Sequence, residues 1–206
     1  IIKQIKKSSK NANIFLIANR NDQIFFPIIR SIMNNYNISN EHLTYVDTTS
    51  SQLETALLAS EIIPQKDFDL PISFTNIDTV LFDRSKYFLF LDDCKANDGI
   101  IDTFVGHSKY YSYIRTEGNN LVSDVEDKNM ISSIACSGLY GFGSYSVMSS
   151  LAIKLLKKNS TSNFTDLYKA YLKNSNQVSF FHSDNPKNTI VLGTTEEYII
   201  NIHKFK

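Results

Sequence analysis

The sequence predicts an α/β fold, and two features of its first half indicate this class. Short apolar runs alternate with longer segments of helical periodicity, which is the order found where helices join the strands of one sheet. The run LPISFTNID at 70–78 reads as a core strand that ends in polar side chains. We therefore expect a largely parallel sheet with right-handed crossovers.

The first half is predicted to hold three helices and three strands. Apolar residues recur at helical spacing in each predicted helix, and each predicted strand is a short apolar run. Asn21 and Asp22 are candidate caps of the second helix, with Pro27 in its first turns, and Ser50 or Ser51 is the candidate cap of the third. The helices are predicted at 1–9, 21–36 and 50–60, and the strands at 13–20, 43–47 and 70–78.

The pattern changes after residue 80. Residues 85–94 fit either a strand or a helix, and the spacing of Phe88, Leu91 and Asp92 favours a short helix. Turn chemistry at Gly118-Asn119 separates two of the β-like runs that follow. The remaining strands are predicted at 99–106, 110–118, 120–128, 134–142, 177–183 and 189–194, and the remaining helices at 148–160, 164–175 and 194–204.

Composition narrows the classes of function. The 206 residues suffice for one sizeable domain, and their 42% hydrophobic and 20% charged content is typical of a folded globular protein. The net charge is zero, which argues against nucleic acid or an anionic membrane as a partner. No apolar run reaches the length of a membrane span, and Cys94 and Cys136 fit a reducing compartment. We expect a cytoplasmic protein whose oligomeric state the sequence leaves open.

Asp78 is the first candidate for chemistry. It follows a predicted core strand in the pattern Asn76-x-Asp78, and ligands of open α/β sheets bind at the carboxyl ends of such strands. Mg²⁺ prefers oxygen ligands and often bridges one carboxylate to substrate phosphates. The alternative is a turn or a helix cap, because Asn and Asp commonly end strands.

Two further segments have both a functional and a structural interpretation. The small-residue loop at 48–51 leads into a helix whose first N–H groups could receive an anion or a base edge, but it contains no glycine and could simply cap the helix. Lys128 could neutralise a phosphate, or it could be an exposed lysine at a turn. The four histidines, at 42, 107, 182 and 203, show no partner pattern.

Taken in order, the motifs resemble a known family. They are T-x-S-Q-x-x-T-A-L-L-A at 49–59, P-I-S-F-T-N-I-D at 71–78, D-G-I-I-D-T-F at 98–104, Y-S-Y-I at 111–114, D-K-N-M-I-S at 127–132, A-C-S-G-L-Y-G-F at 135–142 and L-G-T-T-E-E-Y at 192–198. This series spans nearly the whole chain. It resembles the bacterial sugar-phosphate nucleotidyltransferases, in particular members of capsule and lipooligosaccharide biosynthesis.

The resemblance implies a Rossmann-like, three-layer α/β/α sandwich with a mixed, mainly parallel sheet. It also implies transfer of a nucleotidyl group from an NTP to a sugar phosphate or small phosphorylated acceptor, with Mg²⁺ as cofactor and pyrophosphate as product. Asp78 would hold the metal, and Lys128 would lie near the acceptor phosphate. The matched motifs assign nucleotide or substrate binding to Ser51, Gln52, Thr55, Asn76, Tyr113 and Gly138.

The sequence departs from the family pattern at several points. Ser51 replaces the glycine expected before Gln52, Asp127 replaces a glutamate, and Val191 stands where many members carry a second metal-binding aspartate. We expect one domain over 1–206 whose first strand and glycine-rich triphosphate loop lie outside this range. Two alternatives remain: a non-catalytic relative of the same fold, and a glycosyltransferase, for which D-x-D would be expected in place of Asn76-x-Asp78.

Overall fold

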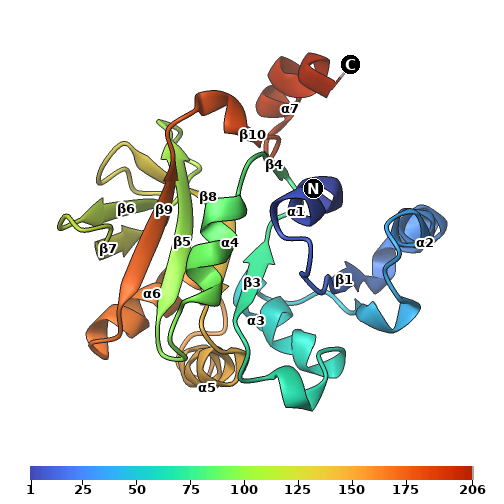
Figure 1. The fold of residues 1–206 in the computed structure, drawn as a ribbon, viewed down its shortest axis with the longest axis horizontal. Helices are drawn as coiled ribbons and strands as arrows, with labels where there is room; N and C mark the ends of the chain where they lie inside the picture. The colour runs from blue at the N-terminus through green and yellow to red at the C-terminus, as the bar shows by residue number, and fades with distance from the viewer. Residues whose placement is uncertain (206) are drawn as a thin grey trace.

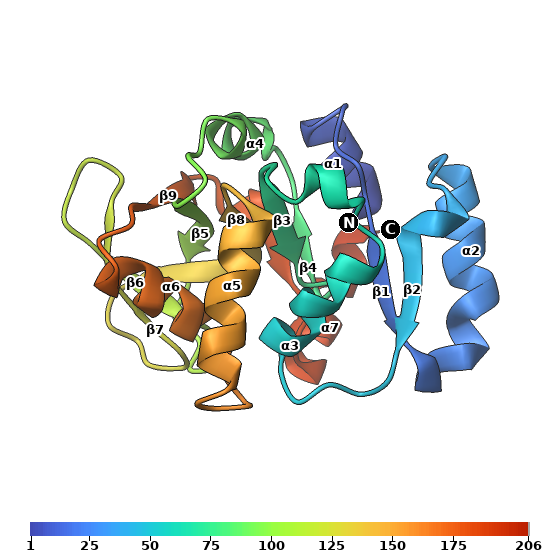
Figure 2. The same ribbon diagram turned by 90° about the horizontal axis from the view of Figure 1, so that it is seen from below.

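The computed structural model describes residues 1–205 and shows helices packed on both faces of a central β-sheet (Figure 1). Helices lie on both faces of this sheet in Figure 2, which confirms the predicted three-layer α/β/α sandwich. On one face lie α1 (Ile2–Ser8) and α4 (Ser85–Asp92), and on the other lie α3 (Gln52–Leu57), α5 (Tyr145–Leu156) and α6 (Phe164–Lys173).

The central sheet has six strands. Its order is β7-β6-β8-β5-β9, and β3 pairs with β8 beside this path. The predicted mixed sheet is confirmed, but only β5 and β9 pair in parallel within it, because β8 runs against both β5 and β3. The strands are β3 (Ile72–Thr75), β5 (Gly99–Val105), β6 (Tyr113–Thr116), β7 (Val122–Glu126), β8 (Ile134–Phe142) and β9 (Val178–Ser183).

Two smaller sheets lie beside the central one. β1 (Leu16–Asn19) and β2 (Leu43–Val46) form a parallel pair, and β4 (Thr79–Leu81) and β10 (Thr189–Val191) form an antiparallel pair. The predicted strand at 70–78 is shorter than expected, because β3 ends at Thr75 and the chain turns at Asn76–Asp78 before it continues as β4. The remaining helices are α2 (Phe26–Asn35), with Pro27 in its first turn, and α7 (Thr195–Asn201).

The main core lies between the central sheet and the helices α5 and α6. Aromatic side chains dominate it, and the rings of Phe142 and Tyr168 stack with their centroids 5.0 Å apart. The hydroxyl of Tyr168 is buried but satisfied, since it donates to the carbonyl oxygens of Ile100 at 3.0 Å and Gly141 at 3.1 Å. This rigid core holds β5 and β8 in place, and the loops that follow and precede them surround the candidate site.

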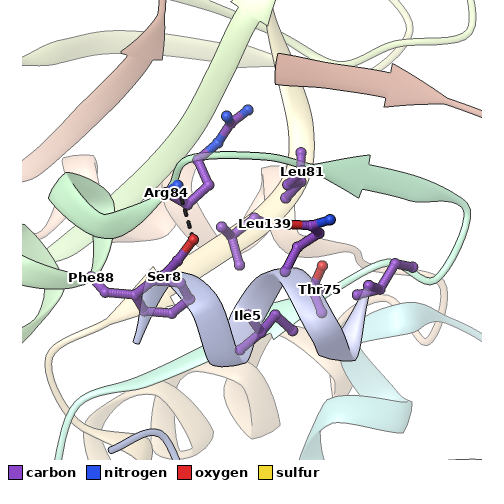
Figure 3. Close-up of a pocket in the computed structure, with 9 residues that line it drawn as sticks. Ile5, Ser8, Thr75, Leu81, Arg84, Phe88 and Leu139 are labelled. Carbon is purple, nitrogen blue, oxygen red and sulfur yellow. Dashed lines mark hydrogen bonds between the residues drawn. The ribbon is translucent and has the colours of Figure 1, made fainter. Parts of the chain in front are cut away.

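The amino-terminal helix α1 is docked against β4 and the start of α4 (Figure 3). Ile5 packs against an apolar cluster that includes Leu81 and Phe88, and the Oγ of Ser8 accepts a hydrogen bond from the backbone N–H of Arg84 at 3.0 Å. A cavity of only about 10 Å³ remains between them. Among residues 1–205, no helix is both long and apolar enough to cross a membrane.

Candidate active site at the carboxyl ends of the strands

The loops that carry the predicted site residues gather at one edge of the central sheet. Thr75 at the end of β3 lies opposite Leu139, and Val105 at the end of β5 lies opposite Ile134. Since β8 runs antiparallel to both, it enters the sheet from the edge toward which β3 and β5 run. The loops after β3 and β5, and the turn before β8, lie at this edge, where ligands of α/β sheets usually bind.

Three of the predicted nucleotide-binding residues form one cluster at this edge. The side-chain oxygen of Asn76 accepts a hydrogen bond from the side-chain amide of Gln52 at 3.2 Å, and the backbone N–H of Asn76 donates to the carbonyl of Gly138 at 2.9 Å. Gly138 has a φ of +88°, and a Cβ there would lie 2.9 Å from the Asn76 amide nitrogen. Only glycine fits this conformation and this close approach without strain.

The loop before α3 fixes the position of Gln52. The hydroxyl of Ser51 caps α3 by accepting the N–H of Glu54 at 3.1 Å, and the Glu54 carboxylate accepts the N–H of Ser50 at 2.5 Å. The hydroxyls of Thr49 and Thr55 are 2.5 Å apart. The side chains of Ser51 and Thr55 are thus occupied in building the loop, and Gln52 is exposed at its tip.

Asp78 lies in the turn between β3 and β4 with an exposed side chain. Its backbone carbonyl accepts the N–H of Leu192 at 2.7 Å, which joins the turn to the end of β10. A Cβ at the next residue, Gly193, would lie 2.9 Å from one Asp78 carboxylate oxygen. Because Gly193 has no side chain, the Asp78 carboxylate can occupy the space beside it. The sequence motif at 192–198 contains this glycine, but nothing in the pattern connected it to Asp78.

Glu197 holds the segment around Gly193 in place. One of its carboxylate oxygens accepts the backbone N–H and the hydroxyl of Thr194, both at 3.0 Å, in a capping box at the start of α7. The other accepts the hydroxyl of Tyr111 at 2.5 Å, and burial followed by this bond raises the pKa of Tyr111. The loop after β5 is thereby tied to the loop after β10.

The donor set at Asp78 fits a magnesium ion that is bound mainly through substrate. Within the described range, no group of three or more His, Cys, Asp and Glu side chains is arranged as a metal site. Mg²⁺ needs no such group, because it is commonly held by one or two carboxylates, several waters and substrate phosphates. The exposed carboxylate of Asp78, with the space beside it that Gly193 leaves, meets this requirement.

Lys128 is exposed in the turn between β7 and β8, at the same edge, with a φ of +52°. Its neighbour Asp127 anchors the turn, since its carboxylate accepts the Ser112 hydroxyl at 2.8 Å and the Asn163 side-chain amide at 3.2 Å. Burial, and then the charges of Cys136, Asp127 and Asp78, raises the pKa of Tyr140.

Tyr113 lies in a different environment from the other predicted residues. Its side chain is fully buried beside Phe104 and Ala135, and its hydroxyl donates to the carbonyl of Ser108 at 2.8 Å. It offers no exposed surface to a substrate and instead supports the loop after β5.

A buried ion pair that the sequence analysis did not identify lies behind the site. The guanidinium of Arg84 lies 2.7 Å from the Asp102 carboxylate and also donates to the Thr189 hydroxyl at 2.6 Å. Both side chains are almost fully buried, and burial raises the pKa of Asp102 to about 6 although Arg84 opposes this shift. The pair ties β5 to the β4–β10 sheet, and the loops at the end of that sheet carry Asp78 and Gly193.

A cavity of about 1050 Å³ opens beside the cluster. Gln52, Thr55 and Asn76 line one part of it, and the rest extends between β1 and β3. The site therefore combines an exposed polar cluster, an exposed carboxylate and a large adjoining hollow.

No protein-family model matches this sequence, and no curated protein matches it at a significant level. Solved structures do match its fold. The nucleoside-diphosphate-sugar pyrophosphorylase from Vibrio cholerae RC9 superposes with a TM-score of 0.75 at 19% identity, over 98% of this chain and 85% of that one.

Two other solved structures are similar over nearly the whole chain. A protein assigned as a glucose-1-phosphate thymidylyltransferase from Bacillus anthracis gives a TM-score of 0.75 at 16% identity, over 95% of this chain and 76% of that one. The inositol-1-phosphate CTP transferase from T. maritima gives a TM-score of 0.66 at 9% identity, over 97% of this chain and 81% of that one. The chain therefore has a nucleotidyltransferase-like fold, and these identities establish the fold alone.

Proposed function

We propose that this protein is a nucleotidyltransferase that joins a nucleotidyl group from an NTP to a phosphorylated small molecule. The observation that supports this most strongly is the arrangement of side chains at the carboxyl end of β3. Gln52 and Asn76 are hydrogen-bonded to each other there, and Asp78 is exposed in the same turn. The fold similarity to proteins named as sugar-nucleotide and inositol-phosphate transferases is consistent with this chemistry.

Each residue of the cluster has a role in the proposal. The side chains of Gln52 and Asn76 supply donors and acceptors for the base of the NTP, positioned by the loop that Ser51 and Thr55 build. Gly138, which has no side chain, allows Asn76 to pack directly against the backbone of β8. Tyr113 has an indirect role, because its hydroxyl supports the loop after β5.

Asp78 is the proposed ligand of Mg²⁺, and Lys128 is the proposed partner of the acceptor phosphate. When bound, the metal would neutralise charge on the NTP phosphates. An oxygen of the acceptor phosphate attacks the α-phosphorus, a new P–O bond forms, and the bond to the β-phosphate oxygen breaks to release pyrophosphate. Such a reaction depends on positioning more than on covalent catalysis.

The acceptor class follows from the family resemblance and is part of the proposal. A sugar phosphate or another small phosphorylated compound would lie between Lys128 and the hollow beside Asn76, and the product would serve bacterial surface-polysaccharide synthesis. We place the reaction in the cytoplasm, in agreement with the free thiols of Cys94 and Cys136.

The test is a substrate panel with the polypeptide as its gene encodes it, including whatever flanks residues 1–206. Each of the four NTPs is combined with sugar 1-phosphates and small phosphorylated alcohols in Mg²⁺, and pyrophosphate release is measured. We expect release with one nucleotide, only in the presence of an acceptor, and a new diphosphate linkage detectable by ³¹P NMR. Absence of turnover across the panel would favour a non-catalytic relative, and transfer from a nucleotide sugar would favour a glycosyltransferase.

A further inference from the structure

The buried ion pair between Arg84 and Asp102 contacts the supports of both parts of the candidate site. Asp102 lies in β5, and Arg84 directly precedes α4, with its side chain directed away from α1 (Figure 3). The Nε of Arg84 is 2.7 Å from the Asp102 carboxylate, and the two side chains are only 2% and 0% exposed. Removing two charges from water is costly, and the proposed reaction has so far used neither residue.

Asp102 faces the part of β8 that contacts the nucleotide-binding cluster. The ladder between β5 and β8 is irregular here, so that Asp102 alone stands opposite residues 137–139 of β8. Gly138, in the middle of this stretch, accepts the backbone N–H of Asn76 at 2.9 Å. Burial raises the pKa of Asp102, and its ion-pair partner and then the buried hydroxyl of Ser137 lower it. The carboxylate of Asp102 therefore interacts with the segment that positions Asn76.

Arg84 holds the β4–β10 pair at one end. Its Nη1 donates to the carbonyl oxygens of Phe82 at 2.6 Å and Asn188 at 3.2 Å, and its Nη2 donates to the hydroxyl of Thr189 at 2.6 Å. These three residues follow β4 and begin β10. A two-stranded pair with three residues in each strand has little stability of its own, so its position depends on contacts of this kind.

The other end of the β4–β10 pair carries the proposed metal ligand. Leu192 directly follows β10 and donates its N–H to the backbone carbonyl of Asp78 at 2.7 Å. Gly193 comes next and lies beside the Asp78 carboxylate. Three residues of a strand span only about 10 Å. A displacement at the Arg84 end of this short pair is therefore expected to move Asp78 as well.

We propose that Arg84 and Asp102 are positioning residues for the reaction, which fix the Asn76 contact and the Asp78 carboxylate relative to each other. This inference rests on the proposed function. Stability alone explains the pair poorly, because apolar side chains of similar volume often replace a buried ion pair without loss of stability. Apolar side chains lack direction, whereas the planar guanidinium with its fixed donors holds β5 and β10 in one relative orientation.

The test removes both charges in one variant, Arg84→Met with Asp102→Val. Either substitution alone would leave a buried charge without its partner and strongly destabilise the fold. We expect the double variant to have a urea midpoint at or above the native value, whereas kcat falls at least about tenfold because reacting groups are misplaced. The Mg²⁺ concentration for half-maximal rate should rise. The KM for the acceptor should stay unchanged, since Lys128 lies in a separate turn.

The matched control is Arg115→Met with Asp124→Val, which removes an exposed ion pair of the same residue types between β6 and β7. It should retain the native kcat and the native dependence on Mg²⁺. A second measurement does not need turnover. The backbone amide resonance of Gly193 in NMR spectra is expected to shift in Arg84→Met/Asp102→Val and to remain unchanged in the control.

Three outcomes separate the possible failures. Native kcat and native Mg²⁺ dependence in Arg84→Met/Asp102→Val would overturn the proposal. A loss of activity that comes with a lower urea midpoint would also overturn it, because the pair would then be needed for folding only. If the native protein releases no pyrophosphate with any substrate, the proposed function itself fails. The Gly193 resonance then decides whether the pair positions this turn, and an unchanged resonance would contradict that role.

Discussion

The side-chain amide of Gln52 donates a hydrogen bond to the side-chain oxygen of Asn76 at 3.2 Å, and this bond joins segments 24 residues apart. It places the start of α3, which follows β2, against the end of β3. The β1–β2 pair and the central sheet therefore present their loops to one site, although no backbone ladder joins them within residues 1–205. Each variant described in this Discussion is to be measured in the polypeptide as its gene encodes it.

Replacing Gln52 with alanine is expected to weaken NTP binding without affecting the fold. Gln52 is exposed, so its loss removes a hydrogen-bonding group from the site and little packing. We expect the KM for the preferred NTP to rise about tenfold, equivalent to about 1.4 kcal/mol, with the KM for the acceptor unchanged. The control is Gln65→Ala, at an exposed turn before β3. Normal nucleotide kinetics in Gln52→Ala would show that Gln52 does not contact the base.

The Gly193→Ala variant is expected to lower kcat, because its Cβ would lie 2.9 Å from the Asp78 carboxylate and displace it. Misplacement of reacting groups by about 1 Å can cost about a hundredfold in rate. The melting temperature should change little, since the Asp78 side chain is exposed and can move. Gly118→Asn is the control, at a turn where nothing lies within 4 Å. Undiminished turnover of Gly193→Ala would show that the position of the Asp78 carboxylate does not matter.

Stability is expected to depend on pH through Asp102. Its folded-state pKa is raised to about 6, so between about pH 4 and 6 the folded state binds this proton more than the unfolded state does. This residue's contribution to the free energy of unfolding therefore decreases as the pH rises through that window. We expect the difference in unfolding free energy between the native protein and Asp102→Asn to change over this range in urea titrations. A difference that stays constant with pH would contradict the raised pKa.

Lys128→Ala is expected to raise the KM for the acceptor and to leave the KM for the NTP unchanged. The exposed side chain contributes little to folding, and loss of one charge near a phosphate typically weakens its binding. Lys66→Ala is the matched control, since Lys66 is exposed in a turn that precedes the amino end of β3. Equal acceptor kinetics in the two variants would show that Lys128 has no role in acceptor binding.

The sequence predicted the alternation of elements well because most strands and helices carry a clear apolar period. The short helix α4 was favoured over a strand on the spacing of Phe88 and Leu91, and both are buried in the structure. The dominant antiparallel pairing was not predictable, since the direction of β8 depends on how the hairpin of β6 and β7 returns to the sheet.

The candidate site was predictable only in part. Gln52, Asn76 and Gly138 lie in separate motifs, and the structure brings all three together. The burial of Tyr113 could not be predicted from its motif, because the neighbouring Tyr111 and Ile114 are equally plausible core residues and a tyrosine can also face a ligand. The pairing of Arg84 with Asp102 could not be predicted either, because neither residue lies in a sequence pattern that indicates an ion pair.

The most direct test of the central claim is pyrophosphate release by the Asp78→Ala variant with the NTP and acceptor that the native protein uses. We predict a loss of turnover by orders of magnitude with an unchanged urea midpoint, because an exposed carboxylate contributes little to folding whereas loss of the metal removes charge stabilisation from the reaction. Asp93→Ala, at an exposed position after α4, should retain full activity. Near-native pyrophosphate release by Asp78→Ala would contradict the account.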